Sequence, residues 1–168
     1  MRWNDIGGTH CSIARSLSVI GDRWTILLLR ESFMRTRRFE DFQANTGASR
    51  AIVADRLRQL VADGVLERVR YQAHPERFEY RLTPKGLDLY PVLTALMAWG
   101  DRWMPVEGGP PVTLTHDCGR TMLPEFVCPH CHEPATPTRV RASVSVQRED
   151  DAGVVVERQQ ARHLQREV

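Results

Sequence analysis

The C-terminal part of the chain contains a cluster of residues that commonly bind metal ions. Residues 116–133 read HDCGRTMLPEFVCPHCHE and hold three of the four cysteines and three of the six histidines. Cys128 and Cys131 have the C-x-x-C spacing that lets two thiolates bind one ion, and His116 and Cys118 form an H-x-C pair upstream. Four such ligands leave no open position, which describes a structural site. The cluster therefore predicts structural zinc held by these four residues.

The same cluster admits other interpretations. His130 and His132 flank the second pair and could replace His116 as the fourth ligand. Cys128 and Cys131 could instead form a redox-active pair, or all the thiols could be unligated. Residues 122–127, which read MLPEFV, are expected to form a strand that returns the chain to the metal.

The pattern does not match the metal sites of enzymes. A zinc deaminase needs an H-x-E motif and a P-C-x-x-C knuckle. Here the first motif reads HDC, and Val127 precedes Cys128. Neither H-E-x-x-H nor G-x-S-x-G occurs in the chain. We expect that the protein is not an enzyme.

Length and composition limit the kinds of protein that could contain this cluster. A chain of 168 residues, 42% hydrophobic and 26% charged, suits one domain with an appendage. No apolar run is long enough to cross a membrane, and the first sixteen residues lack the apolar core of a signal peptide. We therefore expect a cytoplasmic protein with reduced thiols and no membrane partner. The net charge of +2 does not by itself indicate a nucleic-acid partner.

The hydrophobic periodicity upstream predicts the elements that carry the function. Gly21 should end the first helix, and Asp22, Ser49 and Thr83 are placed to cap later helices. Pro91 should kink the last helix or mark its restart. In order, we expect two helices within residues 11–34, a helix over 39–46, a helix over 50–63, strands over 66–71 and 78–82, and a helix over 84–104. This order is typical of a winged helix-turn-helix, mainly α with a small β-hairpin wing.

The chain therefore divides into four predicted parts. Residues 1–104 form the winged helix-turn-helix domain, and residues 105–111, which read PVEGGPP, form a linker. Residues 112–146 form a small zinc-ribbon-like β appendage stapled by the metal. Residues 147–168 are polar and charged, so we expect a flexible tail with at most a short helix around residues 155–164.

The helix that begins after Ser49 is the predicted reading helix. Its apolar side can dock on the preceding helices, which leaves the N-terminal half free to enter the major groove of double-stranded DNA. Arg50 is the best candidate for a base contact, and Ser49 could donate its hydroxyl to a phosphate. The remaining predicted contacts are Ala51 and Ala54 on the outer face, Arg56 and Arg58 to phosphates, and Arg70, His74 and Arg77 on the wing.

Four stretches carry a family resemblance: CSIARSLSVIGDRWTILLLRESF, RFEDFQANTGASRAIVADRLRQLVADGVLERV, ERFEYRLTPKG and AWGDRW. Together they resemble the HxlR-type transcriptional regulators, a branch close to the MarR-like winged helices, over residues 11–104. The resemblance implies a homodimer that binds a pseudo-palindromic operator. The first helix and the long helix after the wing would form most of the dimer interface. Repression by steric block of a promoter is the expected mode.

The resemblance also implies a regulatory signal. Cys11 lies where several family members carry a cysteine that senses oxidants or electrophiles, and a helix N-terminus stabilises a thiolate. The alternative for Cys11 is a packed core thiol. A small-molecule effector could bind at the dimer interface, with Trp24, Trp99 and Trp103 as candidate lining residues. The DCG and CPHC motifs look like those of family members with a C-terminal extension.

A second function from another class stays open. The winged helix could mediate protein contacts while the zinc-binding C-terminal module carries the function. Ala51 and Ala54 offer little hydrogen bonding, so a DNA reader of this sequence would also depend on DNA shape.

Overall fold

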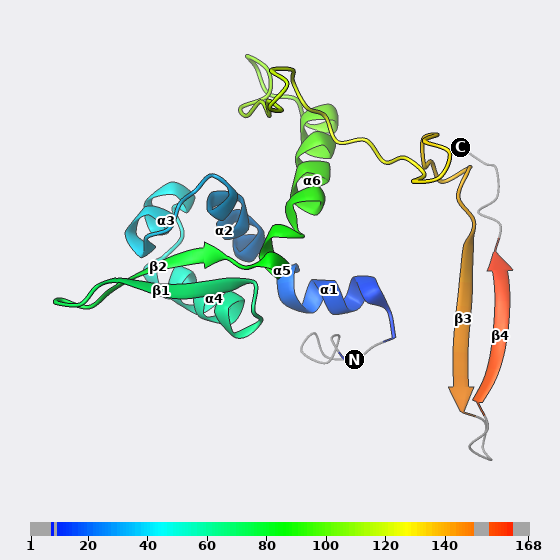
Figure 1. The fold of residues 1–168 in the computed structure, drawn as a ribbon, viewed down its shortest axis with the longest axis horizontal. Coiled ribbons are helices and arrows are strands. Elements are labelled where there is room, and N and C mark those ends of the chain that lie inside the picture. The colour runs from blue at the N-terminus through cyan, green and yellow to red at the C-terminus, as the bar shows by residue number, and fades with distance from the viewer. Residues whose placement is uncertain (1–7, 9, 150–154, 163–168) are drawn as a thin grey trace. The chain divides into compact units, whose positions relative to one another are not determined.

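The computed structural model describes residues 8, 10–149 and 155–162. The chain divides into two compact units, Met1–Thr113 and Leu114–Val168. The first unit is mainly helical and carries one two-stranded hairpin (Figure 1). No helix in the described part of the chain is both long enough and apolar enough to span a membrane.

Four helices precede the hairpin, and local caps define their ends. The Asp22 side chain accepts hydrogen bonds from Trp24 N at 3.0 Å and Thr25 N at 3.2 Å, as expected for an N-cap. Ser49 Oγ accepts from Ile52 N at 3.4 Å. The predicted helices are thus confirmed, with bounds α1 Ser12–Ile20, α2 Arg23–Phe33, α3 Phe39–Thr46 and α4 Arg50–Ala62.

The turn between α3 and α4 needs a residue that accepts a left-handed backbone. Gly47 follows α3 with φ of +68°, and its N–H donates to Gln43 O at 3.0 Å. Glycine adopts this conformation without the steric penalty of a side chain. The turn lets Ser49 cap α4 two residues later, which sets the direction of the predicted reading helix.

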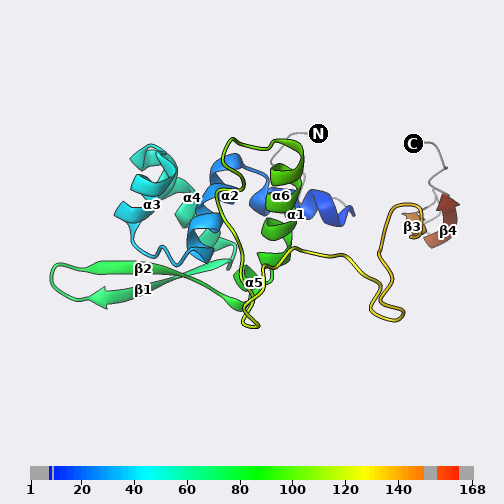
Figure 2. The ribbon, with the colours of Figure 1, turned by 90° about the horizontal axis from the view of Figure 1, so that it is seen from above.

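The wing is an antiparallel hairpin of β1 Leu66–Gln72 and β2 Arg77–Leu82, with Leu66 opposite Leu82. The register shifts between Arg70 and Gln72, so the hairpin is irregular near its tip. Its free end extends beyond α3 in both views (Figures 1 and 2). The end that adjoins α4 is buried, since Leu66 is 1% exposed.

The helix predicted after the wing is divided in two. Thr83 Oγ accepts a hydrogen bond from Gly86 N at 3.1 Å and caps the single turn α5 Pro84–Leu87. The chain then restarts as α6 Tyr90–Trp103, with Pro91 in its first turn, where a missing N–H costs no helical hydrogen bond. Of the two expectations for Pro91, the structure shows the restart.

The core of the first unit lies between α2, α3, α4 and the base of the hairpin. Its largest side chains are less than 2% exposed: Leu28, Leu29, Phe42, Val53, Leu57, Leu60, Val65 and Leu66. Three of these lie on α4, so the apolar face of this helix packs in the core. The opposite face of α4 is therefore left for another partner.

The second unit corrects two expectations. It contains β3 Ala142–Glu149 and β4 Val155–Arg162, which pair antiparallel with Ala142 opposite Arg162. The short helix expected around residues 155–164 is wrong, because residues 155–162 form a strand; residues 163–164 lie outside the described part. Consecutive valines at the start of β4 favour a strand once β3 offers a partner. The tail predicted as flexible thus contributes to both strands.

The strand expected over residues 122–127 is also absent from the structure. Two isolated bridges occur instead, Thr115 with Thr121 and Val127 with Pro134. Pro124 has no N–H to donate to a sheet, which weakens this segment as a strand. The cysteine-containing segment thus consists of two short turns joined by an irregular connection.

Candidate nucleic-acid interface

The N-terminal half of α4 presents an exposed face. Ser49, Arg50, Ala51 and Ala54 are all exposed, whereas Val53 on the opposite side is fully buried. A reading helix requires this arrangement, in which one face packs on the domain and the other is free to approach base edges. The structure therefore places these four predicted residues on one accessible surface.

Arg50 is held at the start of this surface by an aromatic ring. Its guanidinium carbon lies 4.8 Å from the centre of the Phe39 ring on α3. An exposed cation–π contact contributes only about 0.5–1 kcal/mol, so it orients the arginine without preventing it from binding a base or phosphate. Phe39 thus positions the side chain that is best suited to a bidentate contact with guanine.

Arg56 and Arg58 differ in availability. The Arg56 guanidinium is half-buried, with Nε 3.2 Å from Asp22 Oδ1 and Nη1 3.5 Å from Asp55 Oδ2. The Nε group lies within ion-pair distance of Asp22, but the geometry is not that of a hydrogen bond. Within the described residues, it has no other hydrogen-bond acceptor. Arg56 therefore links α4 to the cap of α2, while Arg58, at 73% side-chain exposure, lies open to solvent beside Asp55.

The predicted wing residues lie at the free end of the hairpin. Arg70, His74 and Arg77 are all exposed. Arg70 Nη1 lies 3.5 Å from Glu76 Oε1, and the His74 carbonyl accepts a hydrogen bond from Gln72 Nε2 at 3.0 Å. An exposed ion pair of this kind is weak and exchanges readily for a phosphate contact.

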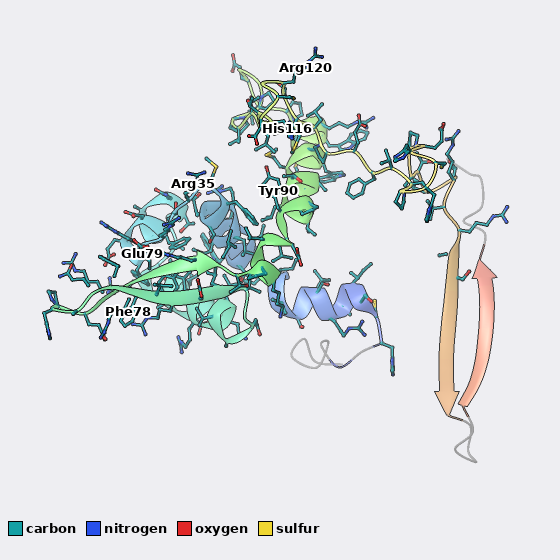
Figure 3. All side chains as sticks on the ribbon, in the orientation of Figure 1. Arg35, Phe78, Glu79, Tyr90, His116 and Arg120 are labelled. Carbon is teal, nitrogen blue, oxygen red and sulfur yellow. The ribbon has the colours of Figure 1, made fainter. Side chains whose placement is uncertain are left out.

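Two further arginines, missed from the sequence, lie against the same hairpin. Arg38 precedes α3, and its guanidinium carbon is 5.1 Å from the centre of the Tyr71 ring on β1. Arg68 stacks on the Phe78 ring at 3.4 Å. Figure 3 shows Phe78 on the hairpin. Residues 35–38, which read RTRR, form a basic turn. Their contacts with the wing join distant parts of the sequence, so no local pattern indicates them.

The basic turn is tied to the wing through its backbone. Tyr80 N donates a hydrogen bond of 2.8 Å to the Arg37 carbonyl, so the turn lies along β2. Glu79, labelled in Figure 3, receives a hydrogen bond from Arg81 at 3.1 Å and has Arg37 at 4.0 Å. The start of α3 and the wing are therefore held as one surface.

A buried carboxylate accepts a hydrogen bond from this turn. Glu31 is 7% exposed, and burial raises its pKa, but hydrogen bonds to the carboxylate outweigh this and hold the pKa below its ordinary value. The donors are Arg30 at 2.7 and 3.0 Å, Asn45 at 2.8 Å and Thr36 at 3.2 Å. The charged carboxylate thus joins α2, the basic turn and α3.

The first pair of predicted metal ligands lies in the H-x-C turn, residues 115–121. His116 N donates to Arg120 O at 2.9 Å, and Cys118 N donates to His116 Nδ1 at 3.2 Å. His116 and Arg120 are labelled in Figure 3. Gly119 follows the cysteine with φ of +80°. The turn therefore places an imidazole and a thiol two residues apart on one short loop.

The second pair lies in the C-x-x-C turn, residues 127–134. Backbone N–H groups of Cys131 and His130 donate to Cys128 Sγ and hold the pKa of this thiol below its ordinary value. His132 follows the second cysteine with φ of +58°, and its N–H donates to Cys128 O at 2.9 Å. Such N–H donors are suited to a thiolate that binds a metal.

The structure does not bring the two pairs together. Across the described residues, no three His, Cys, Asp or Glu side chains lie close enough to share one ion. The four predicted ligands are therefore separated into two halves, and zinc binding stays a prediction.

The predicted regulatory residues are also placed. Cys11 is exposed and occupies the N-cap position of α1, without a side-chain cap hydrogen bond. A cavity of about 320 Å³ lies beside α1, with Val65, Lys85 and Leu89 among its lining residues. The three tryptophans predicted to line an effector pocket do not line this cavity.

A capped helix with a free N-terminal face beside a basic hairpin defines a winged helix-turn-helix domain. The family model for the HxlR-like helix-turn-helix matches residues 19–108, and the chain belongs to this family. The HTH-type transcriptional regulator Rv3095 of Mycobacterium tuberculosis is 45% identical over 130 residues, which cover 77% of this chain and 82% of the relative.

Two solved structures show the same fold. PA1607, described as a candidate transcription factor, is 34% identical with a TM-score of 0.75, over 84% of this chain and 99% of that chain. The redox regulator HypR in its oxidised form is 30% identical with a TM-score of 0.53, over 57% of this chain and all of HypR (100%). The protein is therefore a transcriptional regulator with a helix-turn-helix DNA-binding fold.

Proposed function

We propose that the protein is a homodimeric repressor that binds a pseudo-palindromic operator through α4 and the wing. The observation that carries this proposal is the exposed N-terminal face of α4, with Arg50 positioned over Phe39. Because the buried residues of α4, Val53, Leu57 and Leu60, pack in the core, the exposed face is free to contact another molecule. The major groove of DNA admits an α-helix, and Arg50 suits a contact with a base edge there.

The dimer is supported by an apolar stripe on α6. Its members recur at helical spacing, and each is about half exposed: Val92 at 48%, Leu96 at 50%, Trp99 at 56% and Trp103 at 62%. On α1, Ile13 is 72% exposed and Leu17 is 38% exposed. Contiguous exposed apolar surface of this kind usually marks a protein interface. A second copy would cover it through a symmetric contact of α1 and α6.

A two-fold dimer would determine the form of the operator. It presents two α4 helices, which read half-sites about 34 Å apart on one face of the duplex. Binding at such a site would occlude a promoter and repress transcription. Selection from random double-stranded DNA tests this proposal. It predicts that the bound sequences contain inverted repeats about one helical turn apart. A pool in which no sequence motif is enriched would contradict it.

The dimer can be tested without DNA. Leu96→Glu places a charge in the middle of the α6 stripe and should shift the protein from dimer to monomer in sedimentation equilibrium. Ala44→Glu, an exposed change on α3, is the matched control and should leave the dimer intact. A wild-type protein that sediments as a monomer would contradict the dimer.

We also propose that an oxidant or electrophile regulates binding through Cys11. Its thiol is exposed at the start of α1, next to the proposed dimer face, and HypR is a redox regulator of similar fold. Oxidation there would alter the packing of α1 and hence the spacing of the two reading helices. Diamide should weaken operator binding by the wild type but not by Cys11→Ser. Equal loss in both would rule out Cys11 as the sensor.

The competing function is a winged helix that binds protein while the cysteine module acts. DNA binding through phosphates releases counterions and so depends steeply on salt. If the face binds protein instead, the chain should show no DNA affinity with such a steep salt dependence. The salt dependence of DNA affinity therefore separates the two functions.

A further inference from the structure

The two cysteine-containing turns of the second unit share one construction. Each begins with a potential ligand whose donor atom receives a backbone N–H: His116 Nδ1 in the H-x-C turn and Cys128 Sγ in the C-x-x-C turn. Each is closed by an isolated bridge, and each has a left-handed residue directly after its last cysteine. Each turn thus presents two nitrogen or sulfur donors on a preformed loop.

Neither turn is sufficient as a metal site. A closed zinc site needs four ligands in a tetrahedron, and each turn supplies two of the four predicted ligands. Within the described part of one chain, the two halves are not gathered around a common point. The connection between them, residues 122–126, forms neither helix nor strand. The structure therefore shows two complete halves that one chain does not join.

The connection also carries apolar side chains that lack a cover. Leu123 is 71% exposed and Phe126 is 63% exposed. Two large apolar side chains on an irregular segment between two potential ligand pairs indicate a surface that another chain covers. A second copy of this chain would supply that cover if the two connecting segments exchanged.

We propose that the two turns form a zinc site shared between two copies, with His116 and Cys118 from one copy and Cys128 and Cys131 from the other. This inference rests on the homodimer proposed above. Three thiolates and one imidazole are a ligand set that favours zinc in tetrahedral geometry. The two-fold axis generates two equal sites per dimer.

The local geometry specifies how each residue binds. His116 would bind the ion through a ring nitrogen, and binding through Nδ1 would replace the Cys118 N–H contact that this atom now accepts. The N–H groups of His130 and Cys131 stay on Cys128 Sγ and stabilise it as a bound thiolate. Each zinc ion displaces three thiol protons, which leave to solvent.

Native mass spectrometry of the full chain, purified under reducing conditions, tests the site. The wild-type dimer should carry two zinc ions. Homodimers of His116→Ala/Cys118→Ser and of Cys128→Ser/Cys131→Ser should each carry none. The mixed dimer, isolated with two different tags, should carry one, because one of its two shared sites is complete. His130→Ala/His132→Ala is the matched control and should keep two ions.

The other outcomes overturn the inference in distinguishable ways. A wild-type dimer without zinc removes the site and leaves the proposed homodimer in place. A mixed dimer without zinc, beside a wild type with two ions, means that each site lies within one chain. A monomeric wild type removes the homodimer itself. If a variant fails to fold, the thiolate-to-cobalt absorption of the cobalt-substituted wild type is followed on dilution. A shared site should lose this absorption as the dimer dissociates, and a site that keeps it in the monomer would overturn the inference.

Discussion

Asn45 on α3 donates a hydrogen bond of 2.8 Å from Nδ2 to Oε2 of Glu31 on α2. Thr36 donates to the same oxygen at 3.2 Å, so one carboxylate joins the basic turn to α3. The position of Arg38 beside the wing therefore depends on a charged group inside the first unit. This relationship connects the polar interior of the domain with its proposed DNA-binding surface.

The first prediction concerns acid stability. Because the folded pKa of Glu31 is below its unfolded value, its contribution to stability is complete above the unfolded pKa of about 4.3 and is lost as the pH falls through the folded pKa. Glu31→Gln should lower the free energy of unfolding at neutral pH by about 1–3 kcal/mol and flatten the acid limb. Urea unfolding at several pH values measures both effects, with Glu67→Gln, an exposed carboxylate on β1, as control.

The second prediction separates base reading from phosphate binding. Arg50→Ala should cost about 1–3 kcal/mol of operator affinity and relax sequence preference at one position of each half-site. Arg58→Ala should weaken binding to all sequences alike. Competition binding against single-base operator variants measures the difference. Equal loss of preference in both variants would contradict the assignment of Arg50.

The third prediction tests an arginine that only the structure identifies. Arg38→Ala should reduce DNA affinity several-fold and make its salt dependence shallower, because it removes a cation beside the wing. Arg102→Ala, an exposed change in the last turn of α6, is the matched control. Fluorescence anisotropy with labelled operator measures both variants. Loss of affinity without a change in salt dependence would indicate an indirect effect on the fold.

The fourth prediction concerns the close approach of α5 to the base of the wing. A Cβ at Gly86 would overlap the Val65 carbonyl oxygen and lie 2.9 Å from Leu82 Cδ2. The same carbonyl accepts a hydrogen bond from Thr83 N at 3.1 Å, so it cannot move freely. Gly86→Ala should therefore lower stability by about 1–3 kcal/mol. An unchanged thermal midpoint would show that the α5 turn shifts without cost.

Local signals explain why most of the first unit could be predicted from sequence. Asp22, Ser49 and Thr83 each cap the helix that follows, and Gly47 and Gly64 both adopt the left-handed backbone expected after a helix. These features depend only on residues within one or two turns. The exposed face of α4 followed from the same periodicity.

The parts that sequence reasoning missed depend on distant contacts. The half-buried Arg56 meets Asp22, a residue 34 positions away, so its periodicity alone suggested a free phosphate ligand. Arg38 meets Tyr71 across a similar separation. The strand β4 is paired with β3 along its length. The polar composition of this segment favoured a flexible tail in the sequence-based prediction, because the pairing with β3 cannot be read from the segment itself. The separation of the two cysteine pairs likewise depends on how the whole segment folds.

The central claim is that α4 and the wing bind DNA. Its most direct test is the affinity of the dimer for a selected operator as a function of salt concentration, for the wild type and for Arg50→Ala. At least four phosphate contacts per dimer predict a logarithmic slope of about −4 or steeper, with weaker binding by the variant at every salt concentration. Affinity that is independent of salt, or unchanged by Arg50→Ala, would contradict the account.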